Sequence, residues 1–378
     1  MATNETPLPY PHWMMREMHE QPATLQATLD QWVNANSFRE DAVEPVRAWL
    51  RKAGKEILLV ASGSSRHAGL LAELLVEDLS GVAVDVEYAS EYLYRSEKAL
   101  KDAAVLVVSQ SGETIDTLHA LRKAKGFGHT TLAITNVPGS SMAKDAEFSM
   151  PTAAGRERAV PATKSFTAQL LNLYVLALLA AQVRDALSAD DLQTKLDELG
   201  GLADLVKRQL PRWESSVSAV AKELKDARSF LFVGRGVHYA IAREGALKLK
   251  ESSYLHAEGI PSGELKHGPN ALLSKETPLV MLATVDRSDA ESAERYEKVL
   301  QLMRDMRAQG ATILAVANTG DTAVAELADH VFNVDEASEP LLAISEVIPL
   351  QLFAYFMAVG NGIDVDHPRN LNKAVLAE

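Results

Sequence analysis

The stretch Ser109–Thr114, SQSGET, follows the apolar run Ala103–Val108 and precedes a helical pattern at Ile115–Lys125. The apolar run predicts a buried parallel strand, so a short polar loop is expected between a strand end and a helix N-terminus. Open α/β sheets bind ligands at this position, and the free backbone N–H groups of the helix favour a phosphate. Gly112 allows the backbone to approach such a ligand closely.

The same loop has a simpler interpretation as a helix cap. Ser111 or Thr114 at the N-cap accounts for one hydroxyl well. A cap accounts less well for a glycine, an amide and the hydroxyls of Ser109, Ser111 and Thr114 in one short loop. We therefore favour a phosphate-binding loop. A second hydroxyl-bearing loop, Ser62–Ser65, follows the predicted strand Glu56–Ala61 and is expected at the same edge of the sheet.

Composition excludes several classes of protein. The 378 residues are enough for two domains of about 150 residues each. A net charge of −13 argues against nucleic-acid binding, and the absence of cysteine excludes disulfides, thiolate-bound metals and thiol nucleophiles. The N-terminus does not resemble a signal peptide, and the apolar run Leu170–Val183 is too short to span a bilayer, so we expect a buried core helix and a soluble, cytoplasmic protein.

Apolar runs alternate with helical patterns along both halves of the chain, which predicts an α/β fold with parallel sheets covered on both faces. The predicted strands are Glu56–Ala61, Val82–Tyr88, Ala103–Val108, Thr130–Thr135, a short Phe148–Met150, Ser229–Val233, Pro278–Thr284, Ala311–Ala317 and His330–Val334. LLVASGSSRHAG in the first half resembles LFVGRGVHYAIA in the second, which suggests a duplication with an offset of about 170 residues.

The predicted organisation has four parts. Residues 1–40 form an N-terminal helical arm, with one helix at about 14–33 outside the first sheet. Residues 41–200 form a first α/β domain and residues 201–345 a second. Residues 346–378 form a C-terminal helix and tail, and a polar helical stretch at about 189–226 is expected to connect the domains.

A nucleotide is the obvious alternative to a small phosphorylated molecule as the ligand of this loop. Gly234-Arg235-Gly236 begins like a dinucleotide fingerprint, but Tyr239 stands where the third glycine belongs. The sequence also contains no GxxxxGK[ST] motif. We therefore predict no nucleotide cofactor, and no paired histidine spacing suggests a metal.

A charged constellation occurs in REGALKLKESSY. Spacings of four and three residues place Glu244, Lys248 and Glu251 on one face of a helix. An exposed ion-pair ladder is the simpler explanation, but apolar residues flank the three on several sides. A carboxylate beside a lysine in a cleft is suited to proton transfer. His267, in GELKHGP, sits in a loop and is a candidate acid–base group, although a loop histidine is often simply exposed.

Four motifs together resemble one family: SQSGET, REGALKLKESSYLHAEG, SGELKHGP and the C-terminal PRNLNKAVLAE. They are similar to the isomerase half of glucosamine-6-phosphate synthase, a pair of sugar isomerase (SIS) domains, and the opening HWMMREMHEQP resembles the segment that begins that half. The resemblance covers essentially the whole chain. It implies two SIS domains, each a parallel sheet flanked by helices, with the C-terminal tail over the site.

The resemblance also implies roles for individual residues. Sugar-phosphate binding falls to Ser65, Ser109, Gln110, Ser111 and Thr114, with Ser64 adjacent. Glu251 matches the base that moves a proton between C1 and C2, with Glu244 and Lys248 as supporting charges. His267 matches a ring-opening histidine supplied by the neighbouring subunit, and Lys373 matches a tail lysine at the reactive end of the sugar. Ala162 departs from the family, which has a serine near the sugar there; the lost hydrogen bond is worth about 1 kcal/mol.

The synthase carries a glutaminase domain with a catalytic cysteine. This sequence contains neither such a domain nor any cysteine. The resemblance therefore implies a homodimeric deaminase that converts glucosamine 6-phosphate to fructose 6-phosphate and ammonia without metal or other cofactor. Alternatives are an ammonia-dependent synthase, a synthase subunit fed by a separate glutaminase, and a deglycase or isomerase of another sugar phosphate. A non-catalytic sugar-phosphate-sensing regulator is disfavoured, since no DNA-binding domain is evident and Glu251, His267 and Lys373 would be unexplained.

Overall fold

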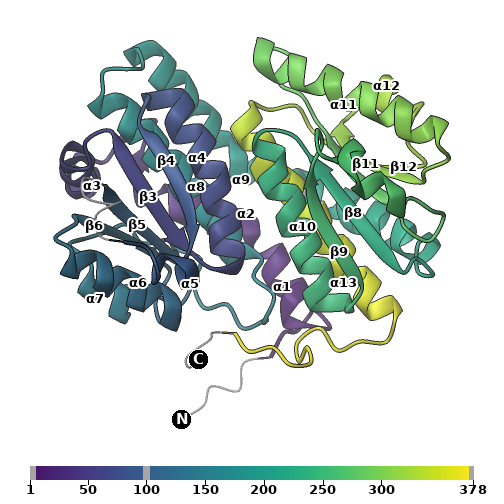
Figure 1. The fold of residues 1–378 in the computed structure, drawn as a ribbon, viewed down its shortest axis with the longest axis horizontal. Helices are drawn as coiled ribbons and strands as arrows, with labels where there is room; N and C mark the ends of the chain where they lie inside the picture. Colours follow the sequence, from purple (N-terminus) through teal and green to yellow (C-terminus); the bar gives the residue numbers. More distant parts are fainter. Residues whose placement is uncertain (1–5, 97–102, 374–378) are drawn as a thin grey trace. The chain divides into compact units, whose positions relative to one another are not determined.

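The computed structural model describes residues 6–96 and 103–373, which form two compact units. The N-terminal unit comprises the described residues of 23–157 and 164–203, together with residues 372 and 373 of the tail. The C-terminal unit comprises residues 6–22, 158–163 and 204–371. Each unit is built around one five-stranded parallel sheet. The predicted α/β fold with one sheet in each half is thus confirmed (Figure 1).

The sheet of the N-terminal unit has the strand order β4-β3-β5-β6-β7. Its strands are β3 Glu56–Ala61, β4 Ala83–Tyr88, β5 Ala104–Ser109, β6 Thr131–Thr135 and β7 Phe148–Ser149. All five coincide with predicted strands to within a residue or two. β3, β5 and β6 are short apolar runs, whereas the edge strand β4 alternates buried and exposed residues. The central strand β5 is buried along its whole length.

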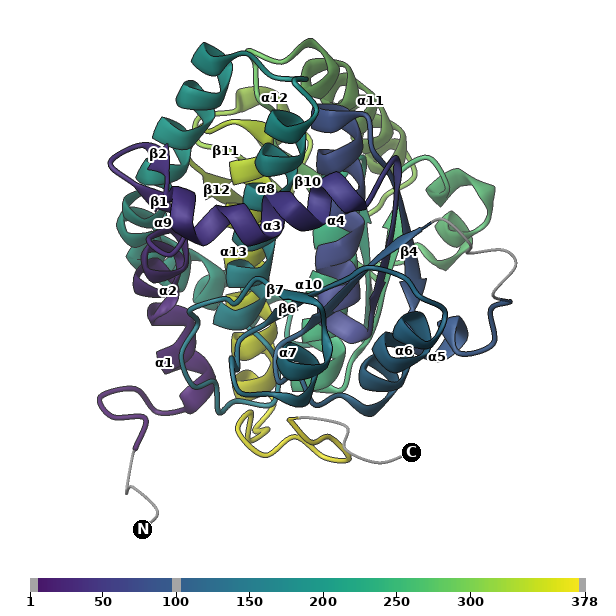
Figure 2. The same ribbon diagram turned by 90° about the vertical axis from the view of Figure 1, so that its left-hand side faces the viewer.

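Helices cover both faces of this sheet (Figure 2). They are α3 Glu40–Lys52, α4 Gly63–Ser80, α5 Ala89–Tyr92, α6 Ile115–Gly126, α7 Ser141–Asp145 and α8 Lys164–Val183, with α2 Gln21–Leu29 before them. Because side chains alternate along a strand, Leu58 and Val60 of β3 join α5, α6 and α7 in one apolar cluster, while Leu59 meets α4 at Gly69 on the other face.

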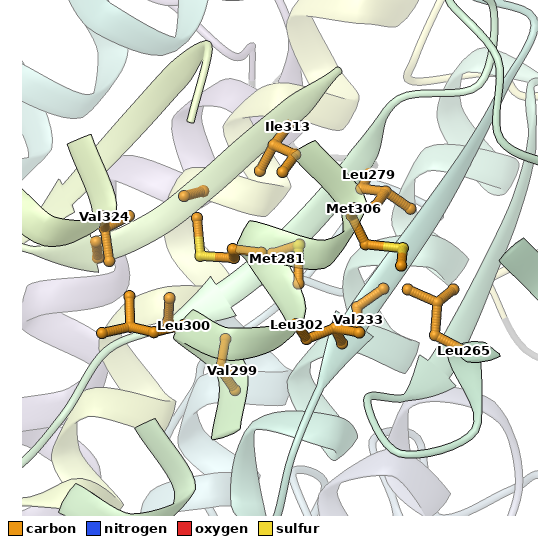
Figure 3. Packing of buried hydrophobic residues seen from close by; sticks show 14 of the residues in the cluster. Val233, Leu265, Leu279, Met281, Val299, Leu300, Leu302, Met306, Ile313 and Val324 are labelled. Atoms are coloured by element: carbon orange, nitrogen blue, oxygen red, sulfur yellow. The ribbon is translucent and has the colours of Figure 1, made fainter. Parts of the chain in front are cut away.

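The C-terminal unit repeats this plan with the order β9-β8-β10-β11-β12. Its elements are β8 Ser229–Gly234, α10 Val237–Ser253, β9 His256–Pro261, the 3-10 turns η2 Leu265–His267 and η3 Pro269–Leu272, β10 Leu279–Ala283, α11 Ala290–Ala308, β11 Ile313–Asn318, α12 Thr322–Ala325, β12 His330–Val334 and α13 Glu339–Gly360. Figure 3 shows one face of the core, where Met281 and Ile313 pack against Leu300 and Met306 of α11. On the other face, α10 and α13 pack together over Phe230 and Phe232.

The matching strand orders support the predicted duplication, since β3, β5 and β6 correspond to β8, β10 and β11. The long helix α9, Ala189–Glu223, lies where a connecting helix was expected, and the boundary between the two units falls inside it, after Ala203.

The N-terminal arm differs from the prediction of one helix. It contains α1 Trp13–His19 and α2, followed by a hairpin of β1 Val33–Asn34 and β2 Ser37–Phe38. Pro22 explains the break, because proline has no N–H and its ring clashes with the carbonyl four residues earlier. Moreover, α1 belongs to the C-terminal unit and contacts α13, so it is not an addition to the first sheet.

The edge strand β9 is absent from the sequence prediction. Its sequence, HAEGIP, contains glycine and proline, which are weak strand signals tolerated at a sheet edge. Gly259 is required there by space, since a Cβ would lie 2.5 Å from the Cα of Arg243 in α10. Residues 256–261 therefore form a strand because they pair with β8 and pack closely on α10, not because of their own strand propensity.

Within the part of the chain that the structure describes, two helices are long and apolar enough to cross a membrane by length and composition alone, α8 and α13. In both, 89% of the most apolar window is buried inside the structure. The predicted core helix at Leu170–Val183 is therefore confirmed, but α8 runs for 20 residues, and it is burial rather than short length that marks it as a core helix.

Candidate active site

The polar loop after β5 is held by its own side chains. The hydroxyls of Ser109 and Thr114 lie 3.1 Å apart, and Ser109 Oγ accepts a hydrogen bond from the N–H of Gly112 at 3.1 Å. Ser111 Oγ accepts from the N–H of Glu113 at 3.1 Å. These bonds fold residues 109–114 into a tight turn at the carboxyl end of β5, immediately before α6.

Gly112 is required in this turn on two grounds. Its φ of +66° lies in the left-handed region, and a Cβ on it would lie 2.2 Å from Ser140 Oγ. The backbone of Gly112 is further tied down, because its carbonyl accepts from the N–H of Met142 at 3.1 Å. The glycine predicted to allow close approach of a ligand is thus also needed for the turn itself.

The alternative that Thr114 caps α6 with its hydroxyl is not what the structure shows. Thr114 is the N-cap residue of α6, but its side chain makes no capping hydrogen bond and instead meets Ser109. Ser111 bonds within the turn. The early backbone N–H groups of α6 therefore receive no hydroxyl cap from Thr114, as a site for an exchangeable anion requires.

Ser64 and Ser65 lie in the first turn of α4, after β3. Because β3 pairs in parallel with β5 and Ala61 is opposite Val108, the two loops leave the sheet at the same edge. Ser65 is buried and Ser64 is half-buried. The structure therefore places the two predicted hydroxyl loops on neighbouring strand ends, as expected.

In the C-terminal unit, α10 brings together the three predicted charged residues. Lys248 Nζ lies 2.5 Å from Glu251 Oε2 and 3.3 Å from Glu244 Oε1. The Lys248 and Glu244 side chains are 1% and 0% exposed, whereas that of Glu251 is 22% exposed. This is not an exposed ladder: one accessible carboxylate stands in front of a buried ion pair.

The pKa of Lys248 lies above its usual range. Burial by itself lowers the pKa of this ammonium, but the attraction of Glu244 and Glu251 and the hydrogen bonds to them outweigh that effect. Lys248 is therefore charged at neutral pH and holds the Glu251 carboxylate in place.

His267 and Ala162 lie outside the hydrogen-bonded and ion-paired groups described above. His267 ends η2 and is exposed, and among the described residues its imidazole is paired with none. The turn is anchored by Leu265, which is buried in the core seen in Figure 3. Ala162 is half-buried, between the buried residues Pro161 and Thr163.

Lys373 has a partner that the sequence did not reveal. Its Nζ pairs with Glu157 Oε2, and the Glu157 side chain is fully buried. Glu157 also accepts hydrogen bonds from Ser165, from the N–H at 3.1 Å and from the Oγ at 2.6 Å. The two residues are 216 positions apart, so no local pattern points to this pair.

The tail is also fixed within the C-terminal unit. Tyr254, which ends α10 in the left-handed conformation, accepts a hydrogen bond from the N–H of Arg369 at 2.8 Å. The guanidinium of Arg369 stacks 4.2 Å from the Tyr254 ring centroid. Asp366 accepts from the N–H groups of Trp13 and Met14 at the start of α1. The sequence prediction overlooked these anchors, although an aromatic residue after a helix is a visible signal.

Two parallel sheets with polar loops at the strand ends define a two-unit, doubly wound α/β protein. Two segments, residues 50–179 and 223–360, match the model of the SIS domain, and the chain therefore belongs to the SIS domain family. The resemblance predicted from the sequence motifs is confirmed.

Relatives extend this result. The chain is 39% identical over 371 residues to the glutamine–fructose-6-phosphate aminotransferase [isomerizing] of Chlorobaculum tepidum and 41% identical over 371 residues to that of Gloeobacter violaceus. These matches cover 98% and 97% of this chain but 59% of each relative. The chain thus spans about three fifths of the length of these curated relatives.

Solved structures agree. The C-terminal domain of glucosamine-fructose-6-phosphate aminotransferase from Francisella tularensis is 33% identical, with a TM-score of 0.89 and coverage of 96% of this chain and 100% of that one. A glucosamine-6-phosphate deaminase from Thermotoga maritima has a TM-score of 0.70 at 23% identity, with coverage of 96% and 99%, which shows a shared fold.

Proposed function

We propose that this protein converts glucosamine 6-phosphate and water to fructose 6-phosphate and ammonia. The observation that carries the proposal is the Glu251–Lys248–Glu244 set, in which a single accessible carboxylate is backed by a buried cation. The polar loop after β5 and the similarity to the isomerase part of aminotransferases that act on fructose 6-phosphate support a phosphosugar substrate. We place the reaction in the cytoplasm.

The phosphate is bound by the loop after β5, helped by the start of α4, through Ser109, Gln110, Ser111, Thr114, Ser64 and Ser65. His267, supplied by the other subunit of a homodimer, protonates the ring oxygen and opens the ring. Glu251 removes the proton from C2 of the open aldehyde, which the adjacent carbonyl acidifies, and an enolamine forms. Lys373 lies at the reactive end and offsets negative charge developing on O1.

Glu251 then returns the proton to C1. O1 gains a proton as the enolamine forms and the nitrogen loses one at this step, so the product is the imine of fructose 6-phosphate, which water hydrolyses with release of ammonia. Lys248 and Glu244 keep the Glu251 carboxylate in position for both transfers. The sequence contains no cysteine that could hydrolyse glutamine through a thiol. When the concentration of free ammonia is low, mass action favours deamination over synthesis.

The test is release of ammonia and fructose 6-phosphate from glucosamine 6-phosphate by purified protein, without glutamine or another protein. We expect equal amounts of both products. We expect Glu251→Gln to lower the rate about 10²- to 10⁴-fold, the usual contribution of a general base. Glu276→Gln, on an exposed glutamate of the same unit, is the matched control.

Other outcomes separate the alternatives. Formation of glucosamine 6-phosphate from fructose 6-phosphate and ammonium, with no net deamination, would indicate an ammonia-dependent synthase or one fed by a glutaminase partner. Inactivity in both directions would point to another sugar phosphate, with Ala162 as the first residue to examine. Full activity of Glu251→Gln would refute the assigned base.

A further inference from the structure

A buried charged cluster in the C-terminal unit has no part in the proposed reaction. His238, in the first turn of α10, lies with Nδ1 2.9 Å from Glu346 Oε2 and with Nε2 3.4 Å from Glu339 Oε1. Arg295 of α11 donates from Nε to Glu339 Oε1 at 3.1 Å. Thr284, just after β10, donates its hydroxyl to Glu346. Glu339 is thus held between an imidazole and a guanidinium.

The imidazole of His238 is a cation. Each ring nitrogen faces a carboxylate, and only the protonated ring donates from both nitrogens. Burial by itself lowers the pKa of His238, but the charges of Glu346 and Glu339 and their hydrogen bonds raise it to about 10. The pair His238 and Arg295 therefore presents two positive charges to Glu339.

The cluster occupies the counterpart of the predicted phosphate site. In the N-terminal sheet, β3 precedes α4 and pairs with β5. In the C-terminal sheet, β8 precedes α10 and pairs with β10. Ser65 is the fourth residue after β3 ends, and His238 is the fourth residue after β8 ends. Arg295 comes from α11, which follows β10 as α6 follows β5. Glu339 therefore lies against the C-terminal counterparts of the elements that carry the N-terminal hydroxyl loops.

The long core helices of the two units begin with opposite charges. Helix α8, which packs on α4, begins with Lys164; helix α13, which packs on α10, begins with Glu339. Both residues are buried, 4% and 6% exposed. The C-terminal unit thus carries a buried negative charge at the helix position where the N-terminal unit carries a positive one.

The loop after β10 is also unlike SQSGET. Its sequence, TVDRSD at 284–289, contains two aspartates. Asp286 accepts from the N–H and Oγ of Ser288, and Asp289 caps α11 through the N–H of Glu291. The donors that a phosphate would use are taken by carboxylates, which would also repel it.

We propose that the Glu339 carboxylate is a built-in ligand, which occupies in the C-terminal unit the anion position that the N-terminal unit keeps for a substrate phosphate. The chain accordingly binds one sugar phosphate, not two. Removal of the Glu339 side chain opens a pocket, lined by His238 and Arg295, that accepts a small inorganic anion. The comparison with the substrate rests on the proposed function; the self-occupied pocket does not.

Thermal unfolding of Glu339→Ala in increasing inorganic phosphate tests the pocket, with chloride at matched ionic strength as the reference. We expect the variant to melt well below wild type in chloride and to recover as phosphate rises, since a ligand that binds only the folded state stabilises it. Glu291→Ala is the matched control, because Glu291 also pairs with Arg295 but is 78% exposed. That variant should respond to phosphate no more than wild type does.

Glu339→Gln keeps the volume but not the charge, so it should melt below wild type without a phosphate response. If Glu339→Ala does not fold in chloride, its refolding yield in phosphate becomes the measurement, and a gain supports the pocket. An equal phosphate response of Glu339→Ala, Glu291→Ala and wild type would overturn the proposal.

Calorimetric titration of wild type with fructose 6-phosphate gives a second test. One site per chain is expected, and two sites per chain would overturn the built-in ligand. No binding would count against the proposed function, whereas rescue of Glu339→Ala by phosphate would still support the built-in ligand, so the two failures are distinguishable.

Discussion

Gly112 is the residue on which the turn after β5 depends, and its replacement tests the site directly. In Gly112→Ala the new Cβ must fit a φ of +66° and a 2.2 Å approach to Ser140 Oγ. Strain of this kind costs about 1–3 kcal/mol, so the turn should move and binding of fructose 6-phosphate should weaken at least tenfold. Gly139→Ala, where nothing lies within 4 Å of a new Cβ, is the control and should bind normally in the same titration.

Lys248 carries a stability prediction. Lys248→Met leaves Glu244 as a buried carboxylate without its cation, and breaking a buried ion pair costs about 3–5 kcal/mol. We expect a matching decrease in the free energy of unfolding, measured with urea. Lys250→Met, an exposed lysine on the same helix, should change stability by less than about 0.5 kcal/mol. Equal losses in both variants would contradict the importance of the buried pair.

Glu157 is predicted to position the tail through Lys373. Glu157→Gln keeps one oxygen as an acceptor for Ser165 but removes the charge that holds the lysine. Trypsin should then cleave after Lys373 faster, and kcat should fall while the KM for the sugar phosphate changes little. Glu147→Gln, which breaks the exposed pair with Lys52, is the control. A purely structural role for Glu157 would lower the melting temperature without changing the cleavage rate.

At the scale of elements, the contact of α10 with α13 predicts a pH dependence of stability. His238 of α10 faces Glu339 and Glu346 of α13. Arg295 of α11 donates to Glu339, and Thr284 after β10 donates to Glu346. The pKa of His238 is raised from 6.5 to about 10, so its contribution is complete below about pH 6.5 and is lost as the pH rises through 10. The pKa of Glu339 is lowered from 4.5 to about 2, so its contribution is present above pH 4.5 and is lost as the pH falls through 2.

The difference in unfolding free energy between wild type and His238→Gln measures this effect. It should be large and constant at pH 5–6 and should shrink steadily from pH 7 to 10. Urea unfolding at each pH provides the values. A difference that stays constant up to pH 10 would show that the charge of His238 does not stabilise the fold.

At the scale of the whole molecule, the proposal that His267 acts in a neighbouring subunit predicts complementation. A homodimer of Glu251→Gln or of His267→Ala should be nearly inactive. An equal mixture, unfolded and refolded together, forms mixed dimers with one intact site, so about a quarter of wild-type activity should return. Activity that stays at the level of the single variants would place His267 and Glu251 of the same chain in one site.

Local sequence patterns determined much of this protein. The strand β5 is an apolar run bounded by polar residues, a pattern typical of a parallel strand that is buried on both faces of its sheet. The contacts of Lys248 with Glu244 and Glu251 follow from helical spacing alone. The strand-end position of Ser109–Thr114 likewise follows from the order of apolar run, polar loop and helix.

Only the tertiary structure decided which distant residues meet. Glu157 and Lys373, 216 residues apart, and His238 and Glu346, 108 apart, come together because separate elements pack, and no periodicity encodes such a pair. The same holds for β9, whose glycine and proline oppose a strand locally but whose pairing with β8 and packing on α10 impose one. Periodicity specifies an element and its buried face, whereas packing of one element on another selects the partners of its charged groups.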